Sequence, residues 1–294
     1  MITGATDGVG RGLAGRFAAA GATVVIPARD PAKAKRVTDE IGGDVSARTV
    51  DLASLASVAA FAEALRRAGR PIDILVNNAG VMAPATRHET ADGFELQFGV
   101  NHLAHVALVA GLLPLLVAGR ARVTTQSSIA VRSARIDFDD LQSVRRYKPM
   151  TAYGQSKLAV TLFALELDRR SRAAGWGLTS NVSHPGLTST NLQAAGPNLG
   201  RTRPGPMDPI FKRLSRLGLL VQTVDGGLLP ALYAATSPDA QGGHFYGPKG
   251  FAHLTGPAAE QAIYRPARDL DVAAWVWEES ARLAGVDLAP ATSR

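Results

Sequence analysis

A tyrosine and a lysine stand four residues apart in the stretch TAYGQSKLAV, at positions 153 and 157. On a helix, residues i and i+4 share one face, so the phenol of Tyr153 and the ammonium of Lys157 would be neighbours. An ammonium about 4 Å away, at an effective dielectric of about 20, favours the phenolate by about 4 kcal/mol. That is enough to lower the pKa of a phenol from about 10 to about 7, where proton transfer is efficient. The alternative is a tyrosine packed on a lysine stem at a helix surface.

A glycine-rich turn, TGATDGVG at 3–10, precedes a helical pattern. Gly4, Gly8 and Gly10 would permit a tight turn and a close approach of the backbone to a pyrophosphate, which the positive end of the helix dipole would attract. The spacing Gly-x3-Gly-x-Gly differs from the GxGxxG of the usual dinucleotide fingerprint. An ordinary turn between a strand and a helix is the alternative.

The next predicted strand ends in the letters IPARD. Sheets that bind NAD normally present a carboxylate at this place to the ribose hydroxyls. Here Ala28 occupies that position, Arg29 follows, and Lys33 comes one turn later. A guanidinium can bind a 2′-phosphate through two hydrogen bonds, whereas a carboxylate would repel it. The sequence therefore predicts NADP(H) rather than NAD(H), unless Arg29 is only a solvated surface charge.

Short β-branched runs alternate with longer helical patterns along the chain. Near-continuous apolar strands are typical of a parallel sheet that is covered on both faces. The alternation predicts an α/β fold with a doubly wound, Rossmann-type parallel sheet between two helical layers, in a single domain spanning 1–294. The predicted strands cover 22–28, 47–52, 72–80, 121–128, 178–186 and, at an edge, 242–248. The predicted helices cover 10–20, 54–68, 94–117, 153–174 and 224–235.

The first strand is unusually short, because only Met1 and Ile2 precede the glycine turn. Strands typically hold about five residues. Strand one is therefore either truncated, or the protein begins a few residues upstream of Met1. No signal peptide is expected, since the motifs begin at Thr3.

Composition narrows the classes of partner. The net charge is +7, yet the basic residues are scattered and their densest groups lack interleaved aromatics, so nucleic-acid binding is not expected. The chain has no cysteine, which fits a reducing cytoplasm, and its six histidines show no metal-ligand spacing with a carboxylate. The stretch 96–119 lacks acidic residues, lysine and arginine, but it contains Asn101 and Pro114. We interpret it as a helix buried against the sheet or a subunit, not as a membrane span.

Seven motifs in order give the chain a family resemblance over nearly its whole length. They are TGATDGVG, DL at 51–52, NNAG at 77–80, VNHL at 100–103, SS at 127–128, YGQSK at 153–157 and HPG at 184–186. Together they resemble the short-chain dehydrogenase/reductase family. The phrase ADGFELQFGVNHLAH and the long insert between the serines and the tyrosine resemble its retinol-dehydrogenase-like, NADP-dependent branch.

The resemblance implies four catalytic residues. Tyr153 would be the general acid in carbonyl reduction, or the base in alcohol oxidation. Lys157 would support it and hold the nicotinamide ribose. Ser128, rather than Ser127, would hydrogen-bond the substrate oxygen, and Asn101 would hold a water that links the lysine to solvent; the alternative for Asn101 is a cap at a helix irregularity.

The resemblance also implies contacts with the cofactor. The residues that match these positions come from the glycine turn, the end of the second strand, the adenine pocket, the NNAG turn, the active-site helix and the HPG loop. They are Gly4, Thr6, Asp7, Gly8, Val9, Gly10, Arg29, Lys33, Asp51, Leu52, Asn78, Ala79, Gly80, Tyr153, Lys157, Pro185, Gly186 and Thr188. His184, just before this loop, could touch substrate, although packing is the preferred interpretation.

The expected function is hydride transfer between NADP(H) and a small hydrophobic ketone, aldehyde or alcohol. The segment 191–224 has apolar residues at helical spacing and one polar face, so it could be a lid over the substrate, or it could pack on the body or a neighbouring subunit. The family is often oligomeric through the helices at 94–117 and 153–174, so a homo-oligomer is an option. The alternative function is a non-catalytic dinucleotide sensor or scaffold.

Overall fold

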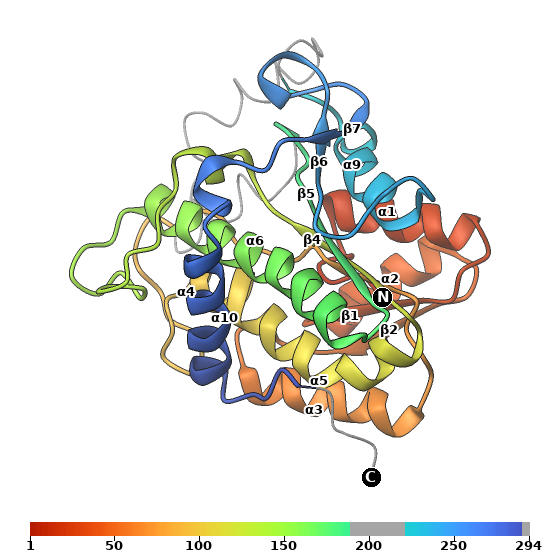
Figure 1. The fold of residues 1–294 in the computed structure, drawn as a ribbon. Helices are drawn as coiled ribbons and strands as arrows, with labels where there is room; N and C mark the ends of the chain where they lie inside the picture. The colour runs from red at the N-terminus through yellow and green to blue at the C-terminus, as the bar shows by residue number, and fades with distance from the viewer. Residues whose placement is uncertain (189–220, 290–294) are drawn as a thin grey trace.

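The computed structural model describes residues 1–188 and 221–289 (Figure 1). A central sheet lies between two layers of helices, and the predicted α/β class is confirmed. Six strands appear close to their predicted places. A seventh, which the sequence did not predict, pairs antiparallel with the sixth, so the sixth is not the edge strand that was predicted. Their bounds are β1 Val24–Ala28, β2 Val45–Thr49, β3 Ile74–Asn77, β4 Arg122–Gln126, β5 Thr179–Ser183, β6 Phe245–Pro248 and β7 Ala258–Gln261.

Residues Met1–Thr3 join the two halves of the sheet. The N–H of Ile2 donates to the carbonyl of Val25 in β1 (3.1 Å), and the N–H of Thr3 donates to the carbonyl of Val76 in β3 (3.0 Å). This strand stub therefore lies between the pair β1–β2 and the run β3–β4–β5–β6–β7. The chain order reverses at this point, and ligands of such sheets bind beyond the carboxyl ends of the strands at the point of reversal.

Helices cover both faces of the sheet (Figure 1). On one face α1, α2 and α9 enclose a core with Leu13 and Ile26 at its centre, and on the other face α3, α5 and α6 enclose Val58 and Leu112. The bounds are α1 Gly8–Ala19, α2 Pro31–Ile41, α3 Leu55–Ala68, α4 Leu96–Phe98, α5 Ala104–Ala118, α6 Pro149–Ala174, α9 Val224–Thr236 and α10 Leu270–Ala284.

Three differences from the predicted helices have physical causes. Helix α2 was not predicted because only Ala34 and Val37 in it are buried, although Asp30 caps it and Pro31 starts it. Helix α10 was also missed; it packs across α6 (Figure 1). The helix predicted at 94–117 is interrupted by one π-helical segment, Gly99–Leu103, which separates α4 from α5.

The apolar helix at Leu96–Ala118 is long and apolar enough to cross a membrane, and 78% of its most apolar 18-residue window is buried inside the fold. It packs against α3, and its buried side chains share one core with residues of β3 and β4, so its low charge is explained by a core position. That the chain has no membrane span stays a prediction. The lid predicted at 191–224 lies outside the described residues except for its last four.

Replacing Leu112 with alanine should lower the free energy of unfolding by about 3 kcal/mol, because the side chain is fully buried and its loss leaves a cavity. The matched change Leu270→Ala removes the same atoms from a residue that is 67% exposed, and it should change stability by less than about 0.5 kcal/mol. Urea unfolding of both variants measures the difference. Equal losses would contradict the core position of α5.

Candidate active site

A cavity of about 680 Å³ opens beyond the carboxyl ends of the strand stub, β3, β4 and β5. Four segments that are far apart in sequence converge on it: the glycine turn, the turn after β3, the serine pair after β4 and the loop after β5. Helix α6 supplies the fifth wall. The predicted site residues that line this cavity are Gly4, Thr6, Asp7, Gly8, Val9, Gly10, Asn78, Ala79, Gly80, Ser128, Tyr153, Lys157, Pro185, Gly186 and Thr188.

Tyr153 and Lys157 both face this cavity from one side of α6. They are 5% and 4% exposed, so the four-residue spacing serves a buried site and not a surface pair. Ser128 approaches from the end of β4, where it caps the 3₁₀-helix Ile129–Ser133. Its hydroxyl forms a hydrogen bond with that of Tyr153.

The electrostatics of the pair differ from the sequence prediction. Burial raises the pKa of Tyr153, and the hydrogen bond with Ser128 opposes that rise only in part. Burial lowers the pKa of Lys157 to about 8. The Nζ of Lys157 donates to the carbonyl of Gln126 (2.8 Å), so the ammonium is bound to the backbone at the end of β4. Loss of water around the phenol therefore outweighs the expected stabilisation of the phenolate.

Asn101 lies in the π-helical segment, and its side chain does not line the cavity. Its Oδ1 accepts from the N–H of Val81 (2.7 Å), and its Nδ2 donates to the carbonyl of Val81 (3.0 Å). A Cβ atom added to Gly80 would lie 3.0 Å from Asn101 Oδ1 and 3.6 Å from Lys157 Nζ, which brings the two side chains to one place. Asn101 thus ties the turn after β3 to the π-helical segment Gly99–Leu103. Single π-helical turns are frequent at functional sites.

The glycine turn and the turn after β3 are locked together. Thr3 Oγ1 accepts from the N–H groups of Asn78 and Ala79 (2.9 Å each), and Asn78 Nδ2 donates to the carbonyl of Thr3 (2.9 Å). A Cβ atom on Gly10 would lie 2.5 Å from the carbonyl oxygen of Gly4, so no other residue fits there. The N-terminus of α1 points into this cradle, and the cradle fits a pyrophosphate.

The residues predicted for the adenosine end lie outside the cavity. Arg29 is exposed, while Lys33 Nζ forms an ion pair with Asp7 Oδ2 (3.3 Å). Asp51 accepts from the N–H of Ala53 (2.9 Å), and Leu52 packs on the core beneath. None of these four residues lines the cavity that holds Tyr153 and Lys157.

Three histidines of the motif regions are core residues. His102 hydrogen-bonds Ser280 of α10 (2.6 Å), and burial lowers its pKa to about 3. His105 bonds Thr3 (3.0 Å) and the carbonyl of Asn101 (3.0 Å), and burial lowers its pKa to about 4. His184 is also fully buried. Among residues 1–188 and 221–289, no three His, Asp or Glu side chains are grouped to hold a metal ion.

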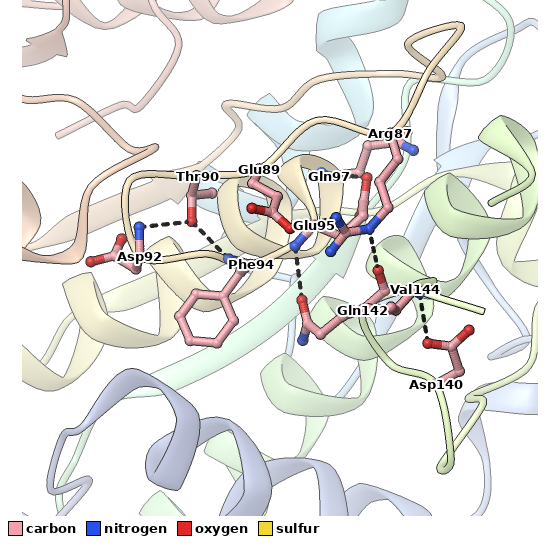
Figure 2. Close-up of polar contacts among 10 residues, drawn as sticks. All are labelled: Arg87, Glu89, Thr90, Asp92, Phe94, Glu95, Gln97, Asp140, Gln142 and Val144. Atoms are coloured by element: carbon pink, nitrogen blue, oxygen red, sulfur yellow. Dashed lines mark hydrogen bonds and ion pairs between the residues drawn. The ribbon is translucent and has the colours of Figure 1, made fainter. Parts of the chain in front are cut away.

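The insert between the serines and the tyrosine is hydrogen-bonded to the segment at 87–95 (Figure 2). The N–H of Glu95 donates to Gln142 Oε1 (2.8 Å), and Arg87 Nε donates to the carbonyl of Gln142 (2.9 Å). From the same segment, Gln97 accepts from the N–H of Ala83 (2.7 Å) and donates to the carbonyl of Pro149, the first residue of α6 (3.1 Å). The segment at 95–97 thereby fixes the turn after β3 to the start of α6, and the insert holds this segment through Gln142.

Sequence analysis missed most of the apolar lining of the cavity: Met82, Val100, Ile129, Ala130, Met150 and Leu187. One signal was available, because Met150 lies three residues before Tyr153 on the same helical face. Gln126 and Ser127 also line the cavity, from the end of β4. The other apolar residues are neighbours of motif residues in turns. Turns have no periodic pattern of apolar residues, so the sequence does not predict which of these side chains face the cavity.

Comparison with known proteins agrees with this architecture. The profile of the family described as short chain dehydrogenase matches residues 1–198. This chain belongs to the short-chain dehydrogenase family. Retinol dehydrogenase 13 of Homo sapiens is 39% identical to it in an alignment 298 positions long, and the alignment covers 98% of this chain and 84% of the relative. The resemblance to the retinol-dehydrogenase-like branch is thus confirmed.

Two solved structures extend the comparison. An uncharacterized protein from Mycobacterium paratuberculosis has a TM-score of 0.78 and 36% identity, over 98% of this chain and 94% of its own. A 3-ketoacyl-(acyl-carrier-protein) reductase from Brucella melitensis, complexed with NADH, has a TM-score of 0.59 and 25% identity, over 80% of this chain and 89% of its own. The chain is therefore an oxidoreductase of a family that binds nicotinamide dinucleotides.

The buried ammonium makes stability depend on pH. Lys157 has a folded pKa of about 8 against an ordinary value of 10.5, so between these values the unfolded chain binds more protons and stability rises with pH. From pH 7 to pH 9 the wild type should gain about 1 kcal/mol relative to Lys157→Met. Urea unfolding of both proteins at the two pH values tests this. A stability difference that stays constant or falls would contradict the lowered pKa.

Proposed function

We propose that this chain transfers a hydride between NADP(H) and a small hydrophobic ketone, aldehyde or alcohol. The observation that supports the proposal is the convergence of Tyr153, Ser128 and Lys157 on one cavity, together with the glycine turn. A protein that only binds a dinucleotide has no need of a phenol held beside a serine hydroxyl and a buried ammonium.

The proposed chemistry follows from the protonation states. Burial keeps the phenol of Tyr153 protonated at neutral pH, as a general acid requires. In carbonyl reduction Tyr153 would give its proton to the substrate oxygen, and Ser128 would hydrogen-bond that oxygen as negative charge develops on it. A bound nicotinamide would supply or take up the hydride. Lys157 would hold the ribose and, by its charge, ease the departure of the phenolic proton.

The apolar walls support a hydrophobic substrate. Met82, Val100, Ile129, Met150 and Leu187 present hydrocarbon surface around the three polar groups. Pockets of this kind take up apolar molecules and orient them through a few polar contacts. The relative named retinol dehydrogenase 13 agrees with an apolar alcohol or aldehyde as the substrate class.

The preference for NADP(H) rests on Arg29 and Lys33. Arg29 is exposed and has no ion-pair partner among the residues that the structure describes. Its guanidinium is therefore available for a 2′-phosphate. Lys33 is engaged by Asp7 (3.3 Å), and this carboxylate would oppose a phosphate nearby. Arg29 thus carries most of the proposed preference.

Two remaining expectations concern the cellular location and the oligomeric state of the protein. A cytoplasmic location and a homo-oligomer stay predictions. Helix α10 packs on α6, so part of the surface that would join subunits through 153–174 is covered within the chain itself. We expect that subunits of any homo-oligomer contact one another without displacing α10 from α6.

Tyr153→Phe should reduce kcat by at least about 1,000-fold, because it removes the proton that the carbonyl oxygen needs. NADPH oxidation, followed by absorbance against a panel of apolar aldehydes and ketones, measures this. The matched variant Tyr233→Phe changes a tyrosine on α9 that does not line the cavity, and it should leave kcat within about twofold. Cofactor binding without turnover of any substrate by the wild type would favour the sensor instead.

Arg29→Ala should lower kcat/KM for NADPH by about 10- to 100-fold and leave the value for NADH within about threefold, because only NADPH carries the 2′-phosphate. Steady-state kinetics with both cofactors give the two ratios. Arg67→Ala removes an exposed guanidinium from α3 and serves as the control. An equal loss with the two cofactors would count against a phosphate contact.

A further inference from the structure

The loop that follows β5 is held from outside by a segment near the C-terminus. The N–H of Leu187 donates to the carbonyl of Leu254 (2.9 Å). Gly186 has a φ of +61°, and a Cβ atom on it would lie 2.2 Å from the carbonyl oxygen of Leu254 and 2.8 Å from Pro248 Cγ. The loop at 185–188 is therefore pressed against residues 248–264, which we call the C-terminal clamp.

His184 connects the loop to the clamp through both ring nitrogens. Its Nδ1 accepts from the N–H of Gly186 (3.2 Å), so Nε2 carries the proton. Nε2 then donates toward Gln261 Oε1 (3.1 Å), with Tyr264 Oη also within 3.3 Å. The orientation of the Gln261 amide is fixed, because its Nε2 donates to the carbonyl of Pro248 (2.7 Å). Burial lowers the pKa of His184 to about 4, so the ring is neutral and keeps this tautomer.

The same clamp reaches the opposite wall of the cavity. Arg132 belongs to the 3₁₀-helix that Ser128 caps. Its guanidinium carbon lies 5.0 Å from the centre of the Tyr264 ring, and its Nη2 donates to the carbonyl of Ala252 (2.9 Å). Tyr264 therefore contacts both the serine side and the His184 side of the site. The loop at 185–188 and the turn after Ser128 are held to one common support.

We propose that His184 is a positioning residue, which fixes the loop at 185–188 to Gln261 and Tyr264 and thereby sets where the nicotinamide end of the cofactor rests. The proposal rests on the proposed function. It assigns a role to residues 248–264, which lie beyond the residues 1–198 that match the family profile. The glycine turn and Arg29, which would hold the adenosine end, are not among the hydrogen-bond partners that His184, Gln261 and Tyr264 have in the described part of the chain.

A positioning role predicts a loss that is confined to one end of the cofactor. 2′-Phospho-ADP-ribose contains every part of NADP+ except the nicotinamide ring. Titration calorimetry of the full chain should show that His184→Ala weakens NADP+ binding about tenfold and 2′-phospho-ADP-ribose binding less than about twofold. His184→Asn should recover much of the loss, because its Oδ1 can still accept from the Gly186 N–H. Gln261→Leu should weaken NADP+ selectively as well.

His102→Ala is the matched control, since it removes another fully buried histidine that bonds a distant helix. It should lower thermal stability without changing the ratio of the two affinities. If His184→Ala lowers the affinity for NADP+ and for 2′-phospho-ADP-ribose equally, or lowers neither affinity, the positioning role is overturned. The pair NAD+ and ADP-ribose repeats the comparison without the 2′-phosphate, so a wrong cofactor preference leaves the test intact. A wild type that binds neither dinucleotide would overturn the proposed function, and the positioning role with it.

Discussion

A buried ammonium and a buried phenol share one cavity. Removing both groups from water costs free energy, and the contacts of the surrounding site offset part of this cost. Taking Lys157 out of water lowers its pKa, and taking Tyr153 out of water raises its pKa. Each group retains one compensating contact: the carbonyl of Gln126 for the lysine and the hydroxyl of Ser128 for the tyrosine. Both contacts come from the end of β4, so this strand end must sit at a fixed distance from α6.

The sheet supplies that fixed distance. Strands β3, β4 and β5 are parallel and in register, and their carboxyl ends deliver the turn at 78–80, the serine pair and the loop at 185–188 to one edge. The strand stub at Met1–Thr3 brings the glycine turn to the same edge, where Thr3 locks it to Asn78. The glycine turn and the serine pair therefore meet at one edge because of a single topological feature, the reversal of strand order.

Braces from distant parts of the chain complete the site. Gln97 holds the turn after β3, the insert holds the segment of Gln97 through Gln142, and the C-terminal clamp holds the loop at 185–188 through His184. Neither brace contains a catalytic group. Both braces act through partly buried hydrogen bonds, although Gln142 Nε2 and His253 Nδ1 have no partner among the described residues. The shape of the site thus depends in part on residues outside the seven motifs, among them Gln142 and Gln261.

The sequence alone determined the α/β class, six of the seven strands, and most of the motif residues that gather at the cavity, because these follow from hydrophobic period and from motifs whose spacing matches local geometry. Tertiary structure decided the rest. It showed that burial, not the neighbouring ammonium, governs the pKa of Tyr153, since desolvation depends on every element that excludes water. It placed Asn101 in a π-helical segment and His184 on Gln261 and Tyr264, contacts between residues about 20 to 80 positions apart that carry no local signal. Helix α2 was missed although Asp30 and Pro31 mark its start, because it buries only Ala34 and Val37 and so has a weak apolar period.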